Sequence, residues 1–277
     1  MEHVPFSVAI SVYKNDDPEH FNIALQSITQ GQTCQPDEIV LIVDGPVSDG
    51  LNTVIARYEA QYSGFRVIRL EENRGLGNAL RLAVENCTHE LIARMDSDDI
   101  ALPTRFEQQL CCFAENPELD IVGGDITEFI GDSENVVGKR IVPRRDADIK
   151  QYMKKRCAMN HMTVMYKKTA VLNAGNYMDW FWNEDYYLWI RMMENSCTFA
   201  NTGSILVNVR SGADMYRRRG GKKYFQSEKG LQDYMLKKQL IGYGTYSMNV
   251  LKRWAVQVAM PNRLRGWVFR TFARSKE

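Results

Sequence analysis

Short apolar runs alternate with helical patterns along the first hundred residues, and this alternation constrains the fold more than any other feature. Four runs of apolar and β-branched residues are expected to be strands: Phe6–Tyr13, Glu38–Asp44, Phe65–Leu70 and Glu90–Met95. The gaps between them carry apolar residues at helical spacing, such as Phe21, Leu25 and Ile28 after Pro18. Strands separated by helices build a mostly parallel sheet. We therefore expect an α/β fold that binds its ligand at the carboxyl ends of the strands.

The second part of the chain is less regular. Further helices are expected over Pro103–Glu115, Asn183–Asn195 and Tyr224–Ile241. Further strands are expected over Asp120–Ile130, Thr163–Lys167 and Ser204–Arg210, and a basic loop over Lys139–Arg145. The last of these strands is expected to close the sheet. The sequence contains no internal repeat and no low-complexity linker.

Composition excludes several classes of protein. With 277 residues, 44% of them hydrophobic and 25% charged, the chain can bury a large core without disulfides or metal staples. Its six scattered cysteines form no CxxC motif and are expected to be reduced thiols. A net charge of +1 gives no strong field for a polyanion, so we expect no nucleic-acid partner. The sequence shows no signal peptide and no transmembrane stretch, so a cytoplasmic protein is expected.

Basic residues are concentrated at the C-terminal end. Residues 241–277 contain seven Lys or Arg and one acid, a net charge of +6, so the other 240 residues carry −5. In a helix expected after Pro261, Leu264, Val268 and Phe272 align on one side. We expect residues 248–277 to bind an anionic membrane surface as a basic amphipathic segment. The alternative is a helix packed on the body of the protein.

Acidic residues follow three of the expected strands, and the segment Arg94–Asp99 (RMDSDD) is the most specific motif. Carboxylates at positions i and i+2 after a strand can face one divalent cation, and Mg²⁺ and Mn²⁺ prefer oxygen ligands. The structural alternative is a solvated turn in which Asp99 caps the next helix. Haloacid-dehalogenase-type phosphatases also use Asp-x-Asp, but near the first strand and followed by Gly-Thr, which is absent here.

Several segments together resemble the inverting family 2 glycosyltransferases of the GT-A fold, in particular the bacterial subgroup that builds O-antigen or exopolysaccharide repeat units. They are Ser7–Asp16, the VDGP segment that contains Asp44, Asn73–Ala79, RMDSDD and Asn183–Arg191. The resemblance covers roughly residues 5–215. It implies a GT-A catalytic domain over 1–215, with a nucleotide-binding part (1–100) and an acceptor part (101–215). A basic loop and C-terminal amphipathic helices would follow over 216–277.

The resemblance also implies a donor site. Residues expected to contact the nucleotide sugar are Ser11, Val12, Tyr13, Asp44, Asn73, Arg74, Gly75, Asp96 and Ser97. Asp44 would contact the uracil or ribose edge of a UDP-sugar. Asp96 and Asp98 match the metal pair, which would hold Mn²⁺ or Mg²⁺ on the leaving diphosphate. The chain departs from the pattern after the tyrosine, where many members have Asn and this chain has Lys14 followed by Asn15.

Glu184 and Asp185 match the catalytic carboxylates of the family. An inverting transfer needs one carboxylate to take the proton of the acceptor hydroxyl, and we assign Asp185 as this base and Glu184 as the residue that positions the acceptor. The alternative is that both acids only favour a helix N-terminus.

Other residues are candidates for contact with the acceptor or with phosphate. His161 would contact acceptor or metal, although a lone His is usually structural. Trp182 would stack on a sugar, as would Trp180, unless they pack in the core. Arg191 would brace Asp185 or touch phosphate, and the run Arg217, Arg218 and Arg219 would close over a pyrophosphate unless it is a solvated charge run.

These implications define an expected activity. The protein would move galactose or glucose from a UDP-sugar to an N-acetylhexosamine on a polyprenyl diphosphate, at the cytosolic face of the inner membrane, in O-antigen or polysaccharide biosynthesis. Alternatives are another nucleotide sugar or acceptor, or a non-catalytic nucleotide-sugar binding protein. A sugar nucleotidyltransferase would show a Gly-rich basic loop after the first strand, where Lys14–Asp17 (KNDD) stands instead.

Overall fold

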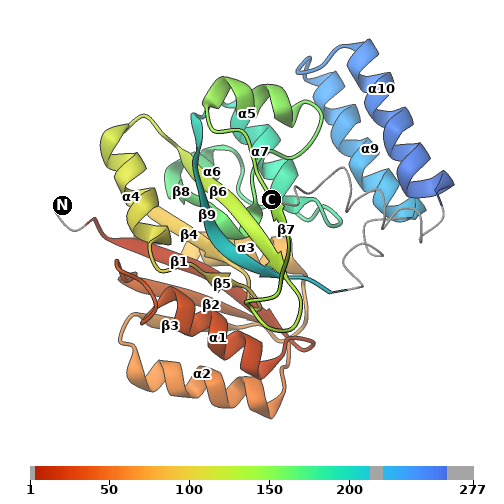
Figure 1. The fold of residues 1–277 in the computed structure, drawn as a ribbon. Coiled ribbons are helices and arrows are strands. Elements are labelled where there is room, and N and C mark those ends of the chain that lie inside the picture. Colours follow the sequence, from red (N-terminus) through yellow and green to blue (C-terminus); the bar gives the residue numbers. More distant parts are fainter. Residues whose placement is uncertain (1–3, 213–220, 261–277) are drawn as a thin grey trace.

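The computed structural model describes residues 4–212 and 221–260. Within them, one nine-stranded sheet has the order β3-β2-β1-β4-β8-β6-β9-β5, and β7 pairs with β6 beside this path (Figure 1). The strands are β1 (Phe6–Tyr13), β2 (Glu38–Asp44), β3 (Phe65–Arg69), β4 (Leu91–Met95), β5 (Ile100–Ala101), β6 (Ile121–Phe129), β7 (Val136–Arg140), β8 (Met165–Lys167) and β9 (Phe199–Arg210).

Helices cover both faces of this sheet. They are α1 (Pro18–Ile28), α2 (Asp49–Gln61), α3 (Leu76–Asn86), α4 (Arg105–Glu115), α5 (Asp146–Met153), α6 (Lys168–Asn173), α7 (Glu184–Glu194), α9 (Lys222–Lys237) and α10 (Tyr243–Trp254), with a 3₁₀ turn at His161–Thr163 and a π-helical turn at Ala255–Ala259. One apolar core lies under α1, α2 and α4, and a second lies under α3, α7 and α9. All six cysteines are present as thiols, as expected.

The first four strands form the parallel half of the sheet, as the alternating pattern predicted. β1 pairs in parallel with both β2 and β4, and β2 pairs in parallel with β3. Every residue of β2 is buried, which explains the unbroken apolar run 39–43 between Glu38 and Asp44. Asp17 starts α1 because its carboxylate accepts the N–H groups of Glu19 and His20 and Pro18 occupies the first turn. Because β1 is parallel to both β2 and β4, all three strands end at one edge of the sheet.

The remaining strands make the sheet mixed. β8 is antiparallel to β4 and β6, whereas β9 is parallel to β6 and antiparallel to β5. The expected basic loop Lys139–Arg145 is partly wrong, because its first residues belong to β7 and Arg140 donates to the side chain of Asn160 at 2.7 Å. β9 begins at Phe199, before the expected start at Ser204, because it pairs with β6 from Ile121 onward.

The helix predicted over Tyr224–Ile241 corresponds to α9, and a second helix, α10, follows it. α9 ends at Lys237, and Gln239 takes a positive φ of 58° in the turn that leads to α10. The expected domain boundary at 215, the run Arg217–Arg219 and the helix expected after Pro261 lie outside the described residues. Among the described helices, none is both long and apolar enough to cross a membrane.

Candidate active site

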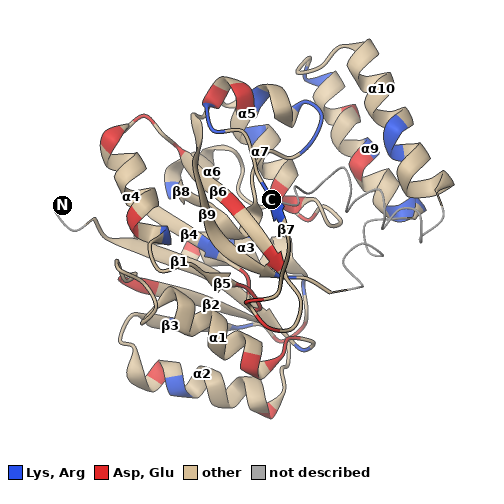
Figure 2. Cartoon of the chain, viewed as in Figure 1, with Lys and Arg blue, Asp and Glu red and all other residues tan. Residues whose placement is uncertain are grey.

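The ends of β1, β2 and β4 bring predicted site residues from three parts of the chain to one edge of the sheet. Tyr13 ends β1, Asp44 ends β2, and Asp96 directly follows β4. The paired register of these strands places Tyr13 opposite Asp44 and Ile10 opposite Met95. In Figure 2 acidic segments lie along the loops that leave this end of the sheet. The sheet therefore juxtaposes carboxylates that are far apart in sequence.

Asp44 holds the loop that precedes α3. Its carboxylate oxygens accept the backbone N–H groups of Arg74 at 2.7 Å and Gly75 at 3.0 Å, and its carbonyl accepts the Asn73 amide at 3.1 Å. Gly75 has a φ of +84°, a conformation that favours glycine. Asp44 is only 4% exposed. Both carboxylate oxygens thus have protein partners, and Asp44 positions the loop that the resemblance assigns to the nucleotide.

Replacing Asp44 by Ala is expected to destabilise the protein by about 1–3 kcal/mol, because two partly buried N–H groups lose their acceptors. Urea unfolding followed by circular dichroism measures this change. Glu72→Ala is the matched control, since Glu72 lies in the same loop with its side chain 76% exposed and pairs only at 3.8 Å with Arg74. Equal stabilities of the two variants would show that the hydrogen bonds accepted by Asp44 contribute nothing to stability.

Asp16 belongs to this edge, although the sequence analysis did not select it. Its Oδ2 atom accepts the backbone N–H of Tyr13 at 3.0 Å and the hydroxyl of Ser97 at 2.9 Å. Asp16 follows β1 as Asp96 follows β4, and these strands are parallel neighbours. This shared position after parallel neighbouring strands is the sequence feature that could have identified Asp16 as a site residue. Ser97, which is predicted to contact the donor, links the two strand ends through Asp16.

Asp96 and Asp98 add their charges to that of Asp16. Asp96 forms an ion pair with Arg94, whose side chain is only 1% exposed. Asp98 is an exposed residue, yet partial loss of solvation around its carboxyl, followed by repulsion from Asp96 and Asp16, raises its pKa to about 6. Burial raises the pKa of Asp16 to about 6 as well, with a smaller contribution from Asp96. The edge carries more negative charge than its own cations offset.

Asp99 does not cap a helix, although the sequence left that role open as an alternative. It is 2% exposed, and its Oδ1 atom accepts the backbone N–H of Arg210 at 2.9 Å. The Arg210 guanidinium in turn donates to the carbonyl of Asp98 at 3.2 Å. Thr104 occupies the N-cap position of α4 instead. Asp99 therefore ties the acidic loop to the end of β9.

The donor set of this edge suits a hard divalent cation. It offers oxygen ligands, from Asp96 and Asp98, and excess negative charge that a cation would relieve. Within the described residues, no three His, Cys, Asp or Glu side chains converge into a metal site. A cation held here would therefore draw further oxygen ligands from water or from the phosphates of a substrate.

Glu184 and Asp185 lie in the first turn of α7, and α3 brings them toward the same edge. A Cβ atom at Gly77 would lie 3.3 Å from the Glu184 Cβ and 3.0 Å from the Met178 carbonyl oxygen, so glycine permits this contact between the two helix N-termini. Burial, followed by repulsion from Asp185, raises the pKa of Glu184 to about 7. Asp96 acts on Glu184 in the same direction, which places both carboxylate sets in one electrostatic environment.

The raised pKa of Glu184 has a consequence for stability. Its native-state pKa of about 7 exceeds the ordinary value of 4.5, so the native state holds the proton more tightly and loses stability as pH rises between these values. Glu184→Gln removes this loss. We expect its stability relative to the original chain to increase by about 1–3 kcal/mol between pH 5 and pH 8. Urea unfolding at both pH values measures it, and a constant difference would contradict the shifted pKa.

Two predicted site residues have structural positions instead. Val12 is 1% exposed and its side chain packs in the core under α1 and α2, so only its backbone is left for a nucleoside; Ser11 is partly exposed and Tyr13 is 37% exposed. The Arg191 guanidinium donates to the carbonyls of Ala174 and Asn176 and stacks on a tyrosine ring. The prediction that Arg191 braces Asp185 or touches phosphate is therefore wrong, because α7 points it toward the turn after α6.

His161 and the two tryptophans differ in their surroundings. The Nε2 atom of His161 lies 2.9 Å from the Tyr177 hydroxyl, and burial, followed by the nearby Arg94 charge, lowers the pKa of His161 well below its usual value. These contacts favour a structural role for a neutral imidazole. Trp180 donates from its indole N–H to the carbonyl of Ser227 and packs against α9, whereas Trp182 is 50% exposed. Arg74 also faces solvent, with its side chain 55% exposed.

Comparison with known proteins identifies the family. A family model described as Glycosyl transferase family 2 matches residues 7–178. The match spans more than half of the 277 residues, so this chain belongs to glycosyltransferase family 2, and glycosyl transfer is its class of activity.

Two relatives cover most of the chain. The amylovoran biosynthesis glycosyltransferase AmsE of Erwinia amylovora is 41% identical over 232 residues, which are 84% of this chain and 85% of the relative. The UDP-Gal:alpha-D-GlcNAc-diphosphoundecaprenol beta-1,3-galactosyltransferase of Escherichia coli is 34% identical over 270 residues, which are 97% of this chain and 96% of the relative. The subgroup that the sequence motifs indicated is thus also the subgroup of these relatives.

Solved structures share the fold. S. aureus TarS 1–349 in complex with UDP-GlcNAc matches with a TM-score of 0.64 at 14% identity, over 96% of this chain and 79% of that chain. The mannosyltransferase PcManGT from Pyrobaculum calidifontis, in complex with GDP-Man and Mn²⁺, matches with a TM-score of 0.63 at 13% identity, over 95% and 72%. These likenesses confirm the expected GT-A fold.

Proposed function

We propose that this protein is an inverting hexosyltransferase that moves galactose or glucose from a UDP-sugar to an N-acetylhexosamine on a polyprenyl diphosphate. One observation carries the proposal: α3 and β4 bring Glu184 and Asp185 into one environment with Asp96, about 90 residues upstream. The names of the two relatives support a role in bacterial O-antigen or exopolysaccharide assembly, and that of the galactosyltransferase supports the donor and the lipid-diphosphate acceptor.

The donor would lie along the edge formed by β1, β2 and β4. The loop held by Asp44 presents the N-terminus of α3 to this edge. The positive end of the α3 dipole there suits a phosphate. Asp96 and Asp98 would hold Mn²⁺ or Mg²⁺, which when bound neutralises charge on the leaving diphosphate. The Mn²⁺ in the PcManGT complex supports this choice of cofactor.

The acceptor would approach the first turn of α7. Asp185 takes the proton of the acceptor hydroxyl while that hydroxyl attacks the anomeric carbon from the face opposite the diphosphate, which inverts the configuration. Because its pKa is raised to about 7, Glu184 can donate a hydrogen bond to a neighbouring acceptor hydroxyl when protonated and accept one from it when ionised. The exposed Trp182 ring offers an apolar face to a sugar.

The proposal extends to organisation and location. Residues 1–215 would form the catalytic domain, with the nucleotide part over 1–100 and the acceptor part over 101–215, and residues 216–277 would form a basic C-terminal region. Residues 248–277 would bind an anionic surface at the cytosolic face of the inner membrane, where a polyprenol-linked acceptor resides. The net charge of +6 over residues 241–277 supports this assignment.

Calorimetric titration of UDP into the protein, first with Mn²⁺ and then with EDTA, tests the donor site. Metal-dependent binding is expected, together with formation of a β-linked disaccharide from UDP-galactose or UDP-glucose and a short-chain GlcNAc-diphosphate lipid. Binding of UDP without turnover of any acceptor would favour the non-catalytic alternative. Absence of UDP binding in the presence of metal would contradict the UDP assignment and direct the search to other nucleotide sugars.

A further inference from the structure

Polar residues provide most of the contacts that hold α10 to the rest of the chain. Asn249 is 5% exposed and donates to the Lys154 carbonyl and the Gln232 side chain. Arg253 forms an ion pair with Glu228 at 2.7 Å and donates to the Lys155 carbonyl at 2.8 Å. These contacts attach α10 to α9 and to the end of α5 mainly through hydrogen bonds and charge.

Four large apolar residues of α10 point the other way, whereas Tyr246 packs against the core. Tyr243 is 79% exposed, Met248 56%, Leu251 65% and Trp254 48%. At 100° per residue, Tyr243, Leu251 and Trp254 fall within one narrow arc and Met248 lies beside it. Figure 1 shows α10 as the outermost helix, on the side of α9 that faces away from the sheet. We define these four residues as the outer face of α10.

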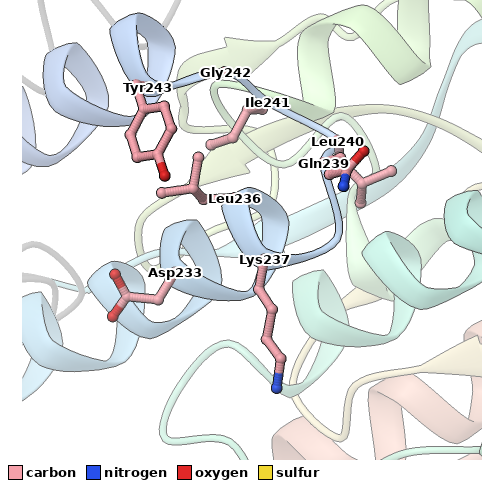
Figure 3. Close-up of a pocket in the computed structure, with 8 residues that line it drawn as sticks. All are labelled: Asp233, Leu236, Lys237, Gln239, Leu240, Ile241, Gly242 and Tyr243. Carbon is pink, nitrogen blue, oxygen red and sulfur yellow. The ribbon is translucent and has the colours of Figure 1, made fainter.

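This arrangement reverses the usual amphipathic pattern, in which the apolar face packs inward. A pocket of about 760 Å³ opens at the turn between α9 and α10, where Leu236, Ile241 and the ring of Tyr243 meet (Figure 3). The pocket thus continues the outer face instead of lying at the strand ends. A helix held by its polar side leaves its apolar side for a partner outside the chain.

We propose that the outer face of α10 inserts into the interfacial region of an anionic lipid bilayer; this inference rests on the proposed function, because it names where the enzyme meets its lipid-linked acceptor. Tyr and Trp are the side chains that favour the membrane–water interface. The charge of the surrounding hairpin indicates which bilayer. Residues 221–260 contain seven Lys or Arg and two acids, a net charge of +5.

Both of those acids are already paired within the hairpin. Glu228 contacts Arg253, and Asp233 contacts Lys229 at 2.8 Å. The exposed Lys252 stands beside the outer face. Residues 261–277 add five Lys or Arg and one acid to the sequence that follows. An anionic surface complements this charge, whereas a second copy of the same hairpin would repel it.

Sedimentation of the full-length protein with unilamellar vesicles tests the proposal. The vesicles contain either phosphatidylcholine alone or an equimolar mixture with phosphatidylglycerol. The double variant Leu251→Ser with Trp254→Ser removes two outer-face side chains without touching the inner contacts. The matched control is Val137→Ser with Ile141→Ser, which changes two apolar residues that are 49% and 55% exposed on and after β7. Thermal unfolding midpoints verify that both variants fold.

The original chain and the control are expected to bind the phosphatidylglycerol vesicles. The outer-face variant is expected to bind them at least about tenfold more weakly. Transfer to a short-chain soluble acceptor should be the same in all three proteins. If the original chain itself shows no such transfer, the proposed function fails, whereas the inference about the outer face is still decided by vesicle binding. Equal vesicle binding by the outer-face variant would overturn the inference. So would a dimer in sedimentation velocity that this variant dissociates without any effect on vesicles.

Discussion

The variant Asp185→Asn is expected to lower kcat about 10²–10⁴-fold, which is the contribution typical of a general base. The amide keeps the shape of the side chain but cannot take the proton of the acceptor hydroxyl. Asp185 lies in the first turn of α7, and the donor contacts we assign come from the ends of β1, β2 and β4. UDP affinity should therefore change by about twofold or less. Steady-state kinetics and UDP calorimetry on the same preparation measure the two quantities.

Glu184→Gln is the matched control for this prediction. It makes the same chemical change at the adjacent position, where we assign positioning of the acceptor. It should raise KM for the acceptor more than it lowers kcat, because hydrogen bonding by the amide remains possible. If Asp185→Asn keeps a normal kcat while Glu184→Gln loses it, the two roles must be exchanged. If both variants turn over normally, α7 does not carry the catalytic base.

The variant Asp98→Asn is expected to lower transfer about 10²–10³-fold and to make UDP binding insensitive to EDTA. A metal that neutralises a leaving diphosphate contributes several kcal/mol, and each 1.4 kcal/mol corresponds to about tenfold in rate. Asp98 is the exposed member of the acidic pair, whereas one oxygen of Asp96 is already bound to Arg94. Binding of Mn²⁺, followed by electron paramagnetic resonance, gives a readout that does not depend on turnover.

Asp17→Asn is the matched control for Asp98. Asp17 is exposed and one residue from the acidic cluster, and its carboxylate caps α1. Asn caps helices about as well as Asp, so this variant should keep its stability, Mn²⁺ binding and activity. A response to EDTA that persists in Asp98→Asn would remove Asp98 from the metal site and leave Asp96 or Asp16 as the ligand to examine.

The parallel half of the fold was predictable because β1, β2 and β4 are buried almost throughout. The predicted bounds of β1 and β2 agree with the structure, and those of β3 and β4 differ by one residue at one end. β7 and α10 were missed for opposite reasons. β7 has no alternation of apolar and polar residues, because the neighbouring Val136 and Val137 are both exposed and Gly138 is its buried residue. In α10 four large apolar residues face outward, so its periodicity does not mark a core-facing helix.

The candidate site was predictable where a motif sits at a strand end and less so where tertiary contacts decide. The positions of Asp96, Asp98 and Asp185 follow from their place beside β4 and α7. The hydrogen bonds of Asp44 join it to a loop 30 residues further along the chain. The hydrogen bond between Asp99 and Arg210 joins residues 111 positions apart. Only the folded chain supplies such pairings.

The tie between Asp99 and Arg210 also sets an order on assembly during synthesis. The four parallel strands β1 to β4 lie within residues 6–95 and pair with one another, so they can form while the rest of the chain is still being made. β5 has its partner only once Asn208 follows, since Ile100 pairs with it. The acidic loop between β4 and β5 can therefore be fixed only after β9 has been made. A nascent chain that stops before β9 would hold the parallel strands but would leave the acidic loop and β5 without Arg210 and Asn208, their partners in β9.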